Sequence, residues 1–132
     1  MNSPMKRVLF VCVENSCRSQ MAEAFARIHG AGNVEAYSAG SRPSGKVIPK
    51  AIESMKVIGY DLGSHKSKSL DDLPDVQWDF VATMGCRDEC PFIRATQRED
   101  WQIPDPKDMP PEEFGDVRDL IEEKVRAICR RL

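Results

Sequence analysis

Two side chains near the start of the chain have the types and the spacing of a nucleophilic anion site. Five residues separate Cys12 from Arg18, and Ser19 follows directly. A thiolate is a strong nucleophile, and a planar guanidinium can hold two oxygens of an oxyanion at once. A neighbouring serine can donate a hydrogen bond to the thiolate or to a leaving group. The pattern predicts attack by Cys12 on the central atom of an oxyanion that Arg18 holds.

The segment around these residues reads as strand, loop and helix. Residues 8–11 are a continuous apolar run, typical of a strand buried on both faces, and a helical pattern begins at about Arg18. A loop before a helix N-terminus points successive backbone N–H groups at one spot, where the helix dipole adds positive charge. Asn15 suits this loop, because asparagine tolerates left-handed backbone angles. We expect the oxyanion to be bound by Val13, Glu14, Asn15, Ser16, Cys17, Arg18 and Ser19.

Two more cysteines have a spacing that allows redox chemistry. Three residues separate Cys86 from Cys90, and Pro91 follows. On a helical turn such residues share a face, with Cβ atoms about 5–6 Å apart, which is close to disulfide geometry. A redox-active pair is the favoured interpretation. A zinc site shared with Cys12 and Cys17, and a coincidence, are the alternatives, and we expect no metal.

One carboxylate stands between two prolines. Asp105 lies between Pro104 and Pro106. The fixed backbone angles of the prolines aim the carboxylate in one direction, which suits a general acid or base. The alternative is an ordinary turn residue.

Length and composition exclude several classes of protein. The 132 residues predict one domain spanning residues 1–132. The formal net charge of −2, without a basic block, does not indicate a nucleic-acid partner, and no apolar run is long enough for a membrane span. Residues 1–7 lack the apolar core of a signal peptide, so we expect a cytoplasmic protein. Five cysteines in such a compartment are more typical of catalysis or metal binding than of a disulfide framework.

Strand and helix patterns alternate along the chain. Strands are expected at residues 8–11, 34–38, 78–84 and 101–103, and helices at residues 18–30, 47–58 and 110–130, with a short helical turn at 70–73. The apolar stripes of the first and last helices are Met21, Ala22, Phe25, Ala26 and Ile28, and Phe114, Val117, Leu120, Ile121, Val125 and Ile128. The alternation predicts an α/β three-layer sandwich, with a four-stranded parallel sheet and helices on both faces.

Residues 12–23, read as Cys-Val-Glu-Asn-Ser-Cys-Arg-Ser-Gln-Met-Ala-Glu, resemble the phosphate loop of the low-molecular-weight protein tyrosine phosphatases. They resemble most closely the arsenate reductases built on that fold. Residues 37–40 resemble the segment after the second strand of the family, and Cys86, Cys90 and Asp105 fall where the reductases carry two redox cysteines and an Asp-Pro acid. The resemblance covers nearly the whole chain and implies a low-molecular-weight phosphatase-like fold.

The resemblance implies reduction of arsenate to arsenite, as in arsenic detoxification. Cys12 would form a thiol–arsenate adduct while Asp105 protonates the departing oxygen. Cys86 would then attack Cys12 and release arsenite, and Cys90 would take over the disulfide. Thioredoxin is the expected reductant, but the cysteine pair is more closely spaced than in the best-known branch, so glutaredoxin and small thiols are alternatives. We expect no cofactor, a monomer, and phosphate and sulfate as competing oxyanions.

Two residues depart from the family pattern. Glu14 stands where many relatives have glycine, so its side chain should point away from the bound anion. Some relatives bind potassium beside the loop through residues that match Asn15, Glu23 and Ser38, and Lys68 replaces a further acidic ligand. We hypothesise that the Lys68 ammonium takes the place of this cation.

Two other function classes use the same loop. A phosphatase would hydrolyse phosphomonoesters through a Cys12 phosphoenzyme with Arg18 and Asp105, and has no need of the second cysteine pair. The family phosphatases usually carry an aromatic residue after Asp-Pro, where this chain has Lys107. Both differences favour the reductase. The third class is a non-catalytic oxyanion sensor, which Asp105 and the extra thiols disfavour.

Overall fold

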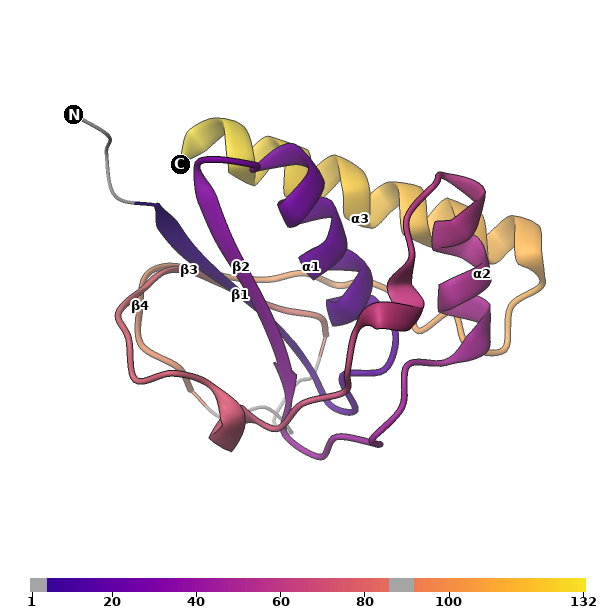
Figure 1. Ribbon diagram of the computed structural model, residues 1–132, viewed down its shortest axis with the longest axis horizontal. Coiled ribbons are helices and arrows are strands. Elements are labelled where there is room, and N and C mark those ends of the chain that lie inside the picture. The colour runs from indigo at the N-terminus through magenta and orange to yellow at the C-terminus, as the bar shows by residue number, and fades with distance from the viewer. Residues whose placement is uncertain (1–4, 86–91) are drawn as a thin grey trace.

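The centre of the fold is a four-stranded parallel sheet (Figure 1). The computed structural model describes residues 5–85 and 92–132. The strands are β1 (Lys6–Cys12), β2 (Val34–Gly40), β3 (Trp78–Thr83) and β4 (Ala95–Asp100), in the order β2-β1-β3-β4. All three pairings are parallel. The predicted α/β class and four-stranded parallel sheet are confirmed.

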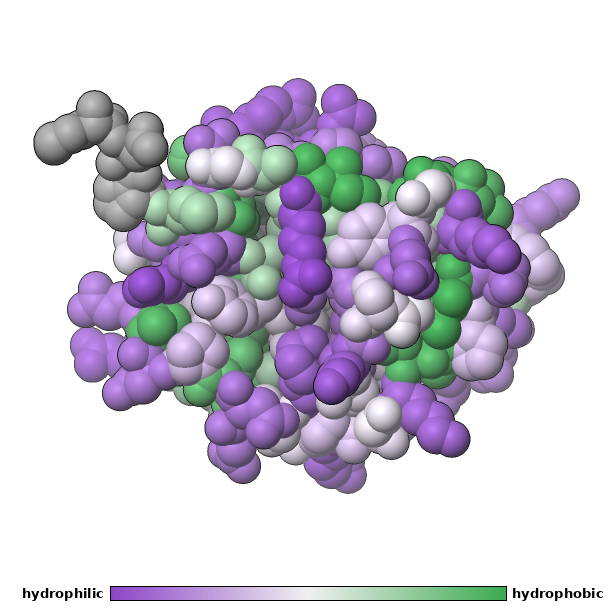
Figure 2. Space-filling view, viewed as in Figure 1, coloured by the Kyte–Doolittle hydropathy of each residue, from purple (hydrophilic) through white to green (hydrophobic). Residues whose placement is uncertain are grey.

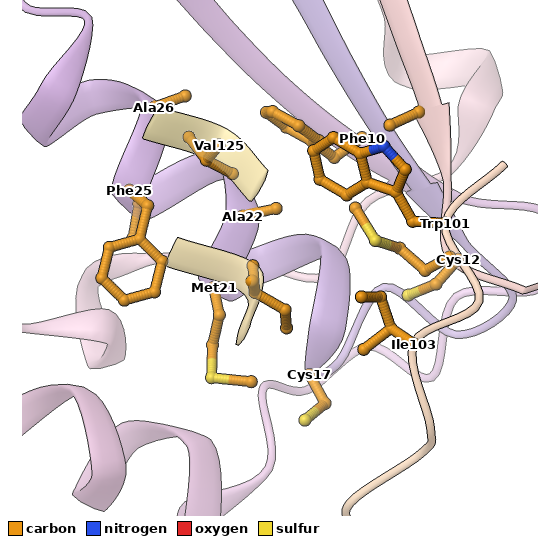
Figure 3. Close-up of a cluster of buried hydrophobic side chains, with 14 of the residues drawn as sticks. Phe10, Cys12, Cys17, Met21, Ala22, Phe25, Ala26, Trp101, Ile103 and Val125 are labelled. Atoms are coloured by element: carbon orange, nitrogen blue, oxygen red, sulfur yellow. The ribbon is translucent and has the colours of Figure 1, made fainter. Parts of the chain in front are cut away.

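Three α-helices pack on one face of this sheet. They are α1 (Arg18–His29), α2 (Pro49–Val57) and α3 (Pro111–Arg131). Their buried side chains share one apolar cluster with Phe10 of β1 and Phe80 of β3. Figure 3 shows part of this cluster, with Met21 and Phe25 on α1 and with Trp101 beside Phe10. The central strand β1, buried from Val8 onward, therefore carries Cys12 at its carboxyl end on a rigid base.

The second face of the sheet has a thinner cover. Leu9, Val11 and Val81 point to this side and pack with side chains around the 3₁₀ helix η2 (Leu70–Asp72). Within residues 5–85 and 92–132, none of the residues of α1, α2 or α3 belongs to this cluster. The three-layer prediction is confirmed, because η2 and loops form the described part of the layer on this second face of the sheet.

The predicted strand at residues 101–103 is wrong. The fourth strand is β4, six residues earlier, with the sequence Ala-Thr-Gln-Arg-Glu-Asp. It is an edge strand with mostly exposed side chains, so it has no apolar pattern to reveal it. Trp101 and Ile103 are buried because they pack in the core beyond the strand, where the Trp101 ring lies 5.8 Å from that of Phe10.

The surface is mostly hydrophilic in the view of Figure 2, with apolar side chains in small groups. Two residues of the predicted apolar stripes are exposed, since Ile28 has 43% and Leu120 has 36% of its surface accessible. Both lie at the margin of their stripes, where a helical side chain is only half covered. Among the described residues, no helix has both the length and the apolar character needed to cross a lipid bilayer.

Candidate active site

The loop between β1 and α1 has its carbonyl groups turned outward. The carbonyl oxygens of Val13, Glu14 and Ser16 accept hydrogen bonds of 2.8–3.0 Å from backbone amides of segment 42–48. In a trans peptide the N–H group points opposite to the preceding carbonyl. The N–H groups after these carbonyls therefore point away from segment 42–48, toward the inside of the loop. This is the arrangement that binds an anion at a helix N-terminus.

Two backbone positions make this loop conformation accessible. Asn15 has a φ angle of 51°, in the left-handed region, as its residue type predicts. Gly40, at the end of β2, lies against the loop so closely that a Cβ atom there would be 2.5 Å from the Val13 oxygen. A side chain at residue 40 would therefore displace the loop. This contact explains why a glycine ends the Tyr37–Gly40 motif.

Cys12 lies beneath the loop at the end of β1. It is 4% exposed, and its Sγ atom is 2.8 Å from the Oγ atom of Ser19. The same Oγ atom accepts a hydrogen bond of 2.8 Å from Nδ2 of Asn15. Because the serine oxygen already accepts from Asn15, its own proton is available for the sulfur. When Cys12 is a thiolate its sulfur can only accept, so Ser19 then donates to it and stabilises the negative charge.

Behind the loop, further side chains form a chain of hydrogen bonds in which each residue donates to the next one toward the loop. The hydroxyl group of Tyr60 lies 2.7 Å from Nε2 of His65, and Nδ1 of His65 lies 3.0 Å from Oε1 of Gln20. The Gln20 amide nitrogen donates to both oxygens of Asn15. Since Oε1 can only accept, the His65 proton sits on Nδ1, and Nε2 accepts from Tyr60. Burial lowers the pKa of His65 below its ordinary value, which agrees with this neutral tautomer.

The sequence did not indicate this chain of hydrogen bonds. The side chain of His65 is 2% exposed, although it lies in the polar segment of residues 64–69. Gln20 and Glu23 on α1 are both fully buried, although neither belongs to the predicted apolar stripe. The available sequence signal for this chain of hydrogen bonds was that Gln20 and Glu23 lie one helical turn apart, on a helix face that must pack against the rest of the protein.

Arg18 is anchored from two distant segments. Its Nη1 atom donates to the carbonyl oxygen of Met84 at 2.7 Å and to that of Ile103 at 2.8 Å. These two contacts fix the plane of the guanidinium group. Its remaining nitrogens can then bind two oxygens of one oxyanion in a defined geometry.

One cavity brings together three of the five predicted catalytic residues. It has a volume of about 210 Å³, and Cys12, Arg18 and Asp105 all line it. Glu14 also lines it and is exposed, so solvent screens its charge. The full lining is Cys12, Val13, Glu14, Ser16, Cys17, Arg18, Ile48, Asp105 and Lys107. The side chains of Asn15 and Ser19 instead support the loop from behind.

The segment that carries Asp105 is fastened to α2. Its carboxylate oxygen accepts a hydrogen bond of 3.2 Å from the Lys107 amide. The Lys50 ammonium on α2 donates to the carbonyl oxygens of Lys107 at 2.8 Å and Met109 at 3.1 Å. The exposed carboxylate, which lines the cavity, therefore lies on a braced turn.

The two other thiols inside the described chain are poor nucleophiles. Cys17 lines the cavity, and burial, followed by the nearby Cys12, raises the pKa of its thiol far above the ordinary range. Burial also raises the pKa of Cys129. Both thiols stay protonated at neutral pH, whereas the attacking form is the thiolate. Cys86 and Cys90 lie outside the described residues.

A buried carboxylate with a lysine beside it lies next to the loop. The Glu23 side chain is 2% exposed, and Ser38 and Arg27 both contact it at 2.6 Å. The Lys68 ammonium is 3.4 Å from Glu23 Oε1 and 3.4 Å from Ser38 Oγ. It thus lies among the side chains predicted to bind a cation in relatives. Within residues 5–85 and 92–132, no three His, Cys, Asp or Glu side chains gather as metal ligands.

Comparisons with known proteins identify the family. The family model described as low molecular weight phosphotyrosine protein phosphatase matches residues 7–132. The chain is 38% identical over 131 residues to a Synechocystis sp. protein named glutaredoxin arsenate reductase, covering 97% of this chain and 99% of that protein. It is 41% identical over 120 residues to an arsenate reductase of Staphylococcus aureus, with 88% and 90% covered.

The solved structures agree. One described as an arsenate reductase in the phosphate binding state has a TM-score of 0.84 and 35% identity, over 96% of this chain and 98% of that one. The predicted resemblance is therefore confirmed over nearly the whole chain. By its sequence, its sheet and its loop between β1 and α1, the chain belongs to the low molecular weight phosphotyrosine protein phosphatase family.

Proposed function

We propose that this protein reduces arsenate to arsenite, with Cys12 as the nucleophile. The observation that carries the proposal is that one cavity is lined by Cys12, Arg18 and Asp105. A thiol, a fork of N–H donors and a carboxyl group around one small cavity suit a tetrahedral oxyanion. Two similar proteins, at 38% and 41% identity, are named arsenate reductases, which supports arsenate as the substrate.

In the first step, the Cys12 thiolate attacks the arsenic atom of bound arsenate. Arg18 and the loop amides bind the negatively charged oxygens, and Ser19 stabilises the sulfur before the S–As bond forms. Asp105 gives its proton to the departing oxygen, which leaves as water. The product is a thiol–arsenate adduct on Cys12 in which arsenic is still As(V).

The second step reduces the arsenic. The Cys86 thiolate attacks the sulfur of Cys12, an S–S bond forms, and the S–As bond breaks. Its electron pair stays on arsenic, which leaves as arsenite. Cys90 then attacks Cys86 and releases the Cys12 thiolate, leaving a Cys86–Cys90 disulfide. The 4% exposure of Cys12 supports such a relay, because a protein reductant cannot reach a sulfur so deeply buried.

A thiol protein supplies the two electrons that open the final disulfide. Thioredoxin is our first candidate. Glutaredoxin is an equal alternative, since the relative from Synechocystis sp. carries that reductant in its name. Either partner, and the free thiols of the relay, fit a reducing compartment such as the cytoplasm. Phosphate and sulfate would compete with arsenate for the same loop, and we propose that the chain acts as a monomer.

Hydrolysis of phosphomonoesters is the alternative function. The cavity lined by Cys12, Arg18 and Asp105 would serve it equally well, and the family model bears the name of phosphatases. In that reaction water attacks a Cys12 phosphoenzyme, and the second cysteine pair has no part. Lys107 lines the same cavity. It directly follows Asp105-Pro106, at the position where the family phosphatases usually have an aromatic residue.

The test measures NADPH consumption with arsenate in two coupled systems, thioredoxin with its reductase and glutaredoxin with glutathione and its reductase. The proposal predicts arsenate-dependent consumption in at least one of them. The Cys12→Ser and Cys90→Ser variants should lose it, while the matched controls Cys17→Ser and Cys129→Ser should keep it. If arsenate causes no NADPH consumption in either system and is not reduced with small thiols, while the protein hydrolyses aryl phosphates, the function is that of a phosphatase.

A further inference from the structure

The start of α2 is tied to the loop that binds the oxyanion. The amide of Ile48, the residue before this helix, donates to the carbonyl oxygen of Ser16 at 3.0 Å, and the Ile48 side chain lines the cavity around Cys12. Lys50 is the second residue of the same helix. One end of α2 therefore reaches both the oxyanion loop and, through Lys50, the segment that carries Asp105.

Lys50 holds the peptide groups that follow Asp105. Its ammonium donates to the carbonyl oxygens of Lys107 at 2.8 Å and Met109 at 3.1 Å. The Lys107 amide donates to a carboxylate oxygen of Asp105 at 3.2 Å, and the Met109 amide donates to the Pro106 carbonyl oxygen at 2.9 Å. Both the N–H and the C=O group of Lys107 are thus engaged, and they connect the carboxylate to α2.

We propose that Lys50 is a positioning residue for the transfer of a proton from Asp105 to the departing oxygen. This inference rests on the proposed function, in which Asp105 is the acid of the first step. Asp105 is exposed, so core packing does not fix its place, and the contacts of Lys50 with the following turn do. A proton donor must lie within hydrogen-bond reach of the leaving oxygen, and a misplacement of roughly 1 Å can slow a reaction about 100-fold.

The anchors of Arg18 do not depend on Lys50. Ile103, whose carbonyl oxygen binds Arg18, is 3% exposed, and its own amide donates to the Trp101 carbonyl oxygen at 2.8 Å. The other anchor, Met84, follows β3 in a different segment of the chain. Loss of the Lys50 contacts should therefore displace the acid and leave the binding of the oxyanion unchanged.

The test compares kcat/KM for phenyl phosphate and dinitrophenyl phosphate, which reports the reaction up to release of the alcohol. Phenolate is a poor leaving group and needs the proton of Asp105, whereas dinitrophenolate is a stable anion and leaves without it. We expect Lys50→Met to lower kcat/KM for phenyl phosphate at least about tenfold and for dinitrophenyl phosphate less than about twofold. Inhibition by phosphate should stay at the wild-type level. Asp105→Asn, the reference, should show the same difference between the two esters more strongly.

Two variants of matched chemistry serve as controls. Lys50→Arg should behave like the wild type, because a guanidinium can donate to both carbonyl oxygens. Lys56→Met changes an exposed lysine in the last turn of the same helix and should also behave like the wild type.

Arsenate provides the second readout, because the oxygen that leaves it also needs a proton. Lys50→Met should slow arsenite release from fully reduced protein at least about tenfold, and Lys50→Arg should not. This readout decides the question even if the wild type hydrolyses neither ester.

The role of Lys50 alone is overturned if Asp105→Asn distinguishes the two esters and Lys50→Met does not. An equal fall for both esters, or weaker inhibition by phosphate, would also overturn it, since those patterns belong to a structural role. If Asp105→Asn treats the two esters alike, or if the wild type neither hydrolyses esters nor reduces arsenate, the proposed function fails, and this inference fails with it.

Discussion

The Oγ atom of Ser19 lies 2.8 Å from the Sγ atom of Cys12, and Asn15 donates to the same serine oxygen. When Cys12 is a thiolate, the serine proton is directed to the sulfur from the first turn of the helix that begins at Arg18. Cys12, the proposed nucleophile, and Ser19 thus lie at the two ends of one short loop.

This contact predicts that Ser19→Ala slows the attack by Cys12. A hydrogen bond to a charged group contributes about 1.5–3 kcal/mol, so the rate of aryl phosphate hydrolysis should fall about 10- to 100-fold. Alkylation of Cys12 by iodoacetamide at pH 7 should slow as well. Ser64→Ala, an exposed serine outside the loop, is the matched control. An unchanged alkylation rate in Ser19→Ala would show that the serine does not support the thiolate.

The anchoring of Arg18 predicts that lysine cannot replace it. A lysine ammonium cannot reach the Met84 and Ile103 carbonyl oxygens and also bind two oxyanion oxygens, because it lacks the planar fork. We expect Arg18→Lys to lower kcat/KM for arsenate about 100-fold or more, and to weaken inhibition by phosphate. Arg130→Lys, at an exposed position near the end of α3, should leave both unchanged. Wild-type inhibition by phosphate in Arg18→Lys would contradict the role assigned to the guanidinium.

The contact of Lys68 with Glu23 predicts an enzyme that does not respond to potassium. The ammonium lies 3.4 Å from both Glu23 and Ser38, where a cation would otherwise balance the buried carboxylate. Replacing sodium by potassium should leave wild-type turnover unchanged. Lys68→Ala should turn over more slowly and recover part of its activity in potassium, whereas Lys46→Ala, an exposed control, should do neither. Strong activation of the wild type by potassium would refute the hypothesis.

The burial of His65 predicts that stability falls as the pH is lowered. Its pKa lies below the ordinary value of about 6.5, chiefly through desolvation and also through Arg27 and Lys68, with Glu23 and Asp61 acting in the opposite sense. Below pH 6.5 the unfolded chain binds a proton that the folded protein does not, so the free energy of unfolding decreases; the contribution is fully present above pH 6.5.

Urea unfolding measured from pH 8 down to pH 6 checks this expectation. His65→Gln should flatten the pH dependence in that range. His29→Gln changes the other histidine of the chain and should keep the decrease. If the His65 variant and the wild type decrease in parallel, another group is responsible.

The fold was predictable where burial leaves a pattern in the sequence. Residues 8–11 lie within β1, because a strand covered on both faces must be apolar throughout. The helix expected from Arg18 is α1. The strand β4 was missed because an edge strand is free to be polar. Its neighbours Trp101 and Ile103 looked like a strand because they are core residues, and burial alone does not distinguish a strand from an irregular segment.

The candidate site was predictable to the extent that it lies within one loop. Cys12, Arg18 and Ser19 are close in sequence, so their spacing carries their geometry. The contacts of Arg18 with Met84 and Ile103, and of Gln20 with His65, join segments that are distant in sequence. No periodic pattern encodes such a contact, and only the assembled sheet and helices bring the partners together.

The most direct test of arsenate reduction by Cys12 is a single turnover without any reductant. Fully reduced protein is mixed with excess arsenate, arsenite is quantified, and the disulfide is located by mass spectrometry of the digested chain. The proposed relay predicts one arsenite per chain, a Cys86–Cys90 disulfide, and no arsenite from Cys12→Ser. Arsenite formed by the Cys12→Ser variant, or none formed by the wild type while it hydrolyses aryl phosphates, would contradict it.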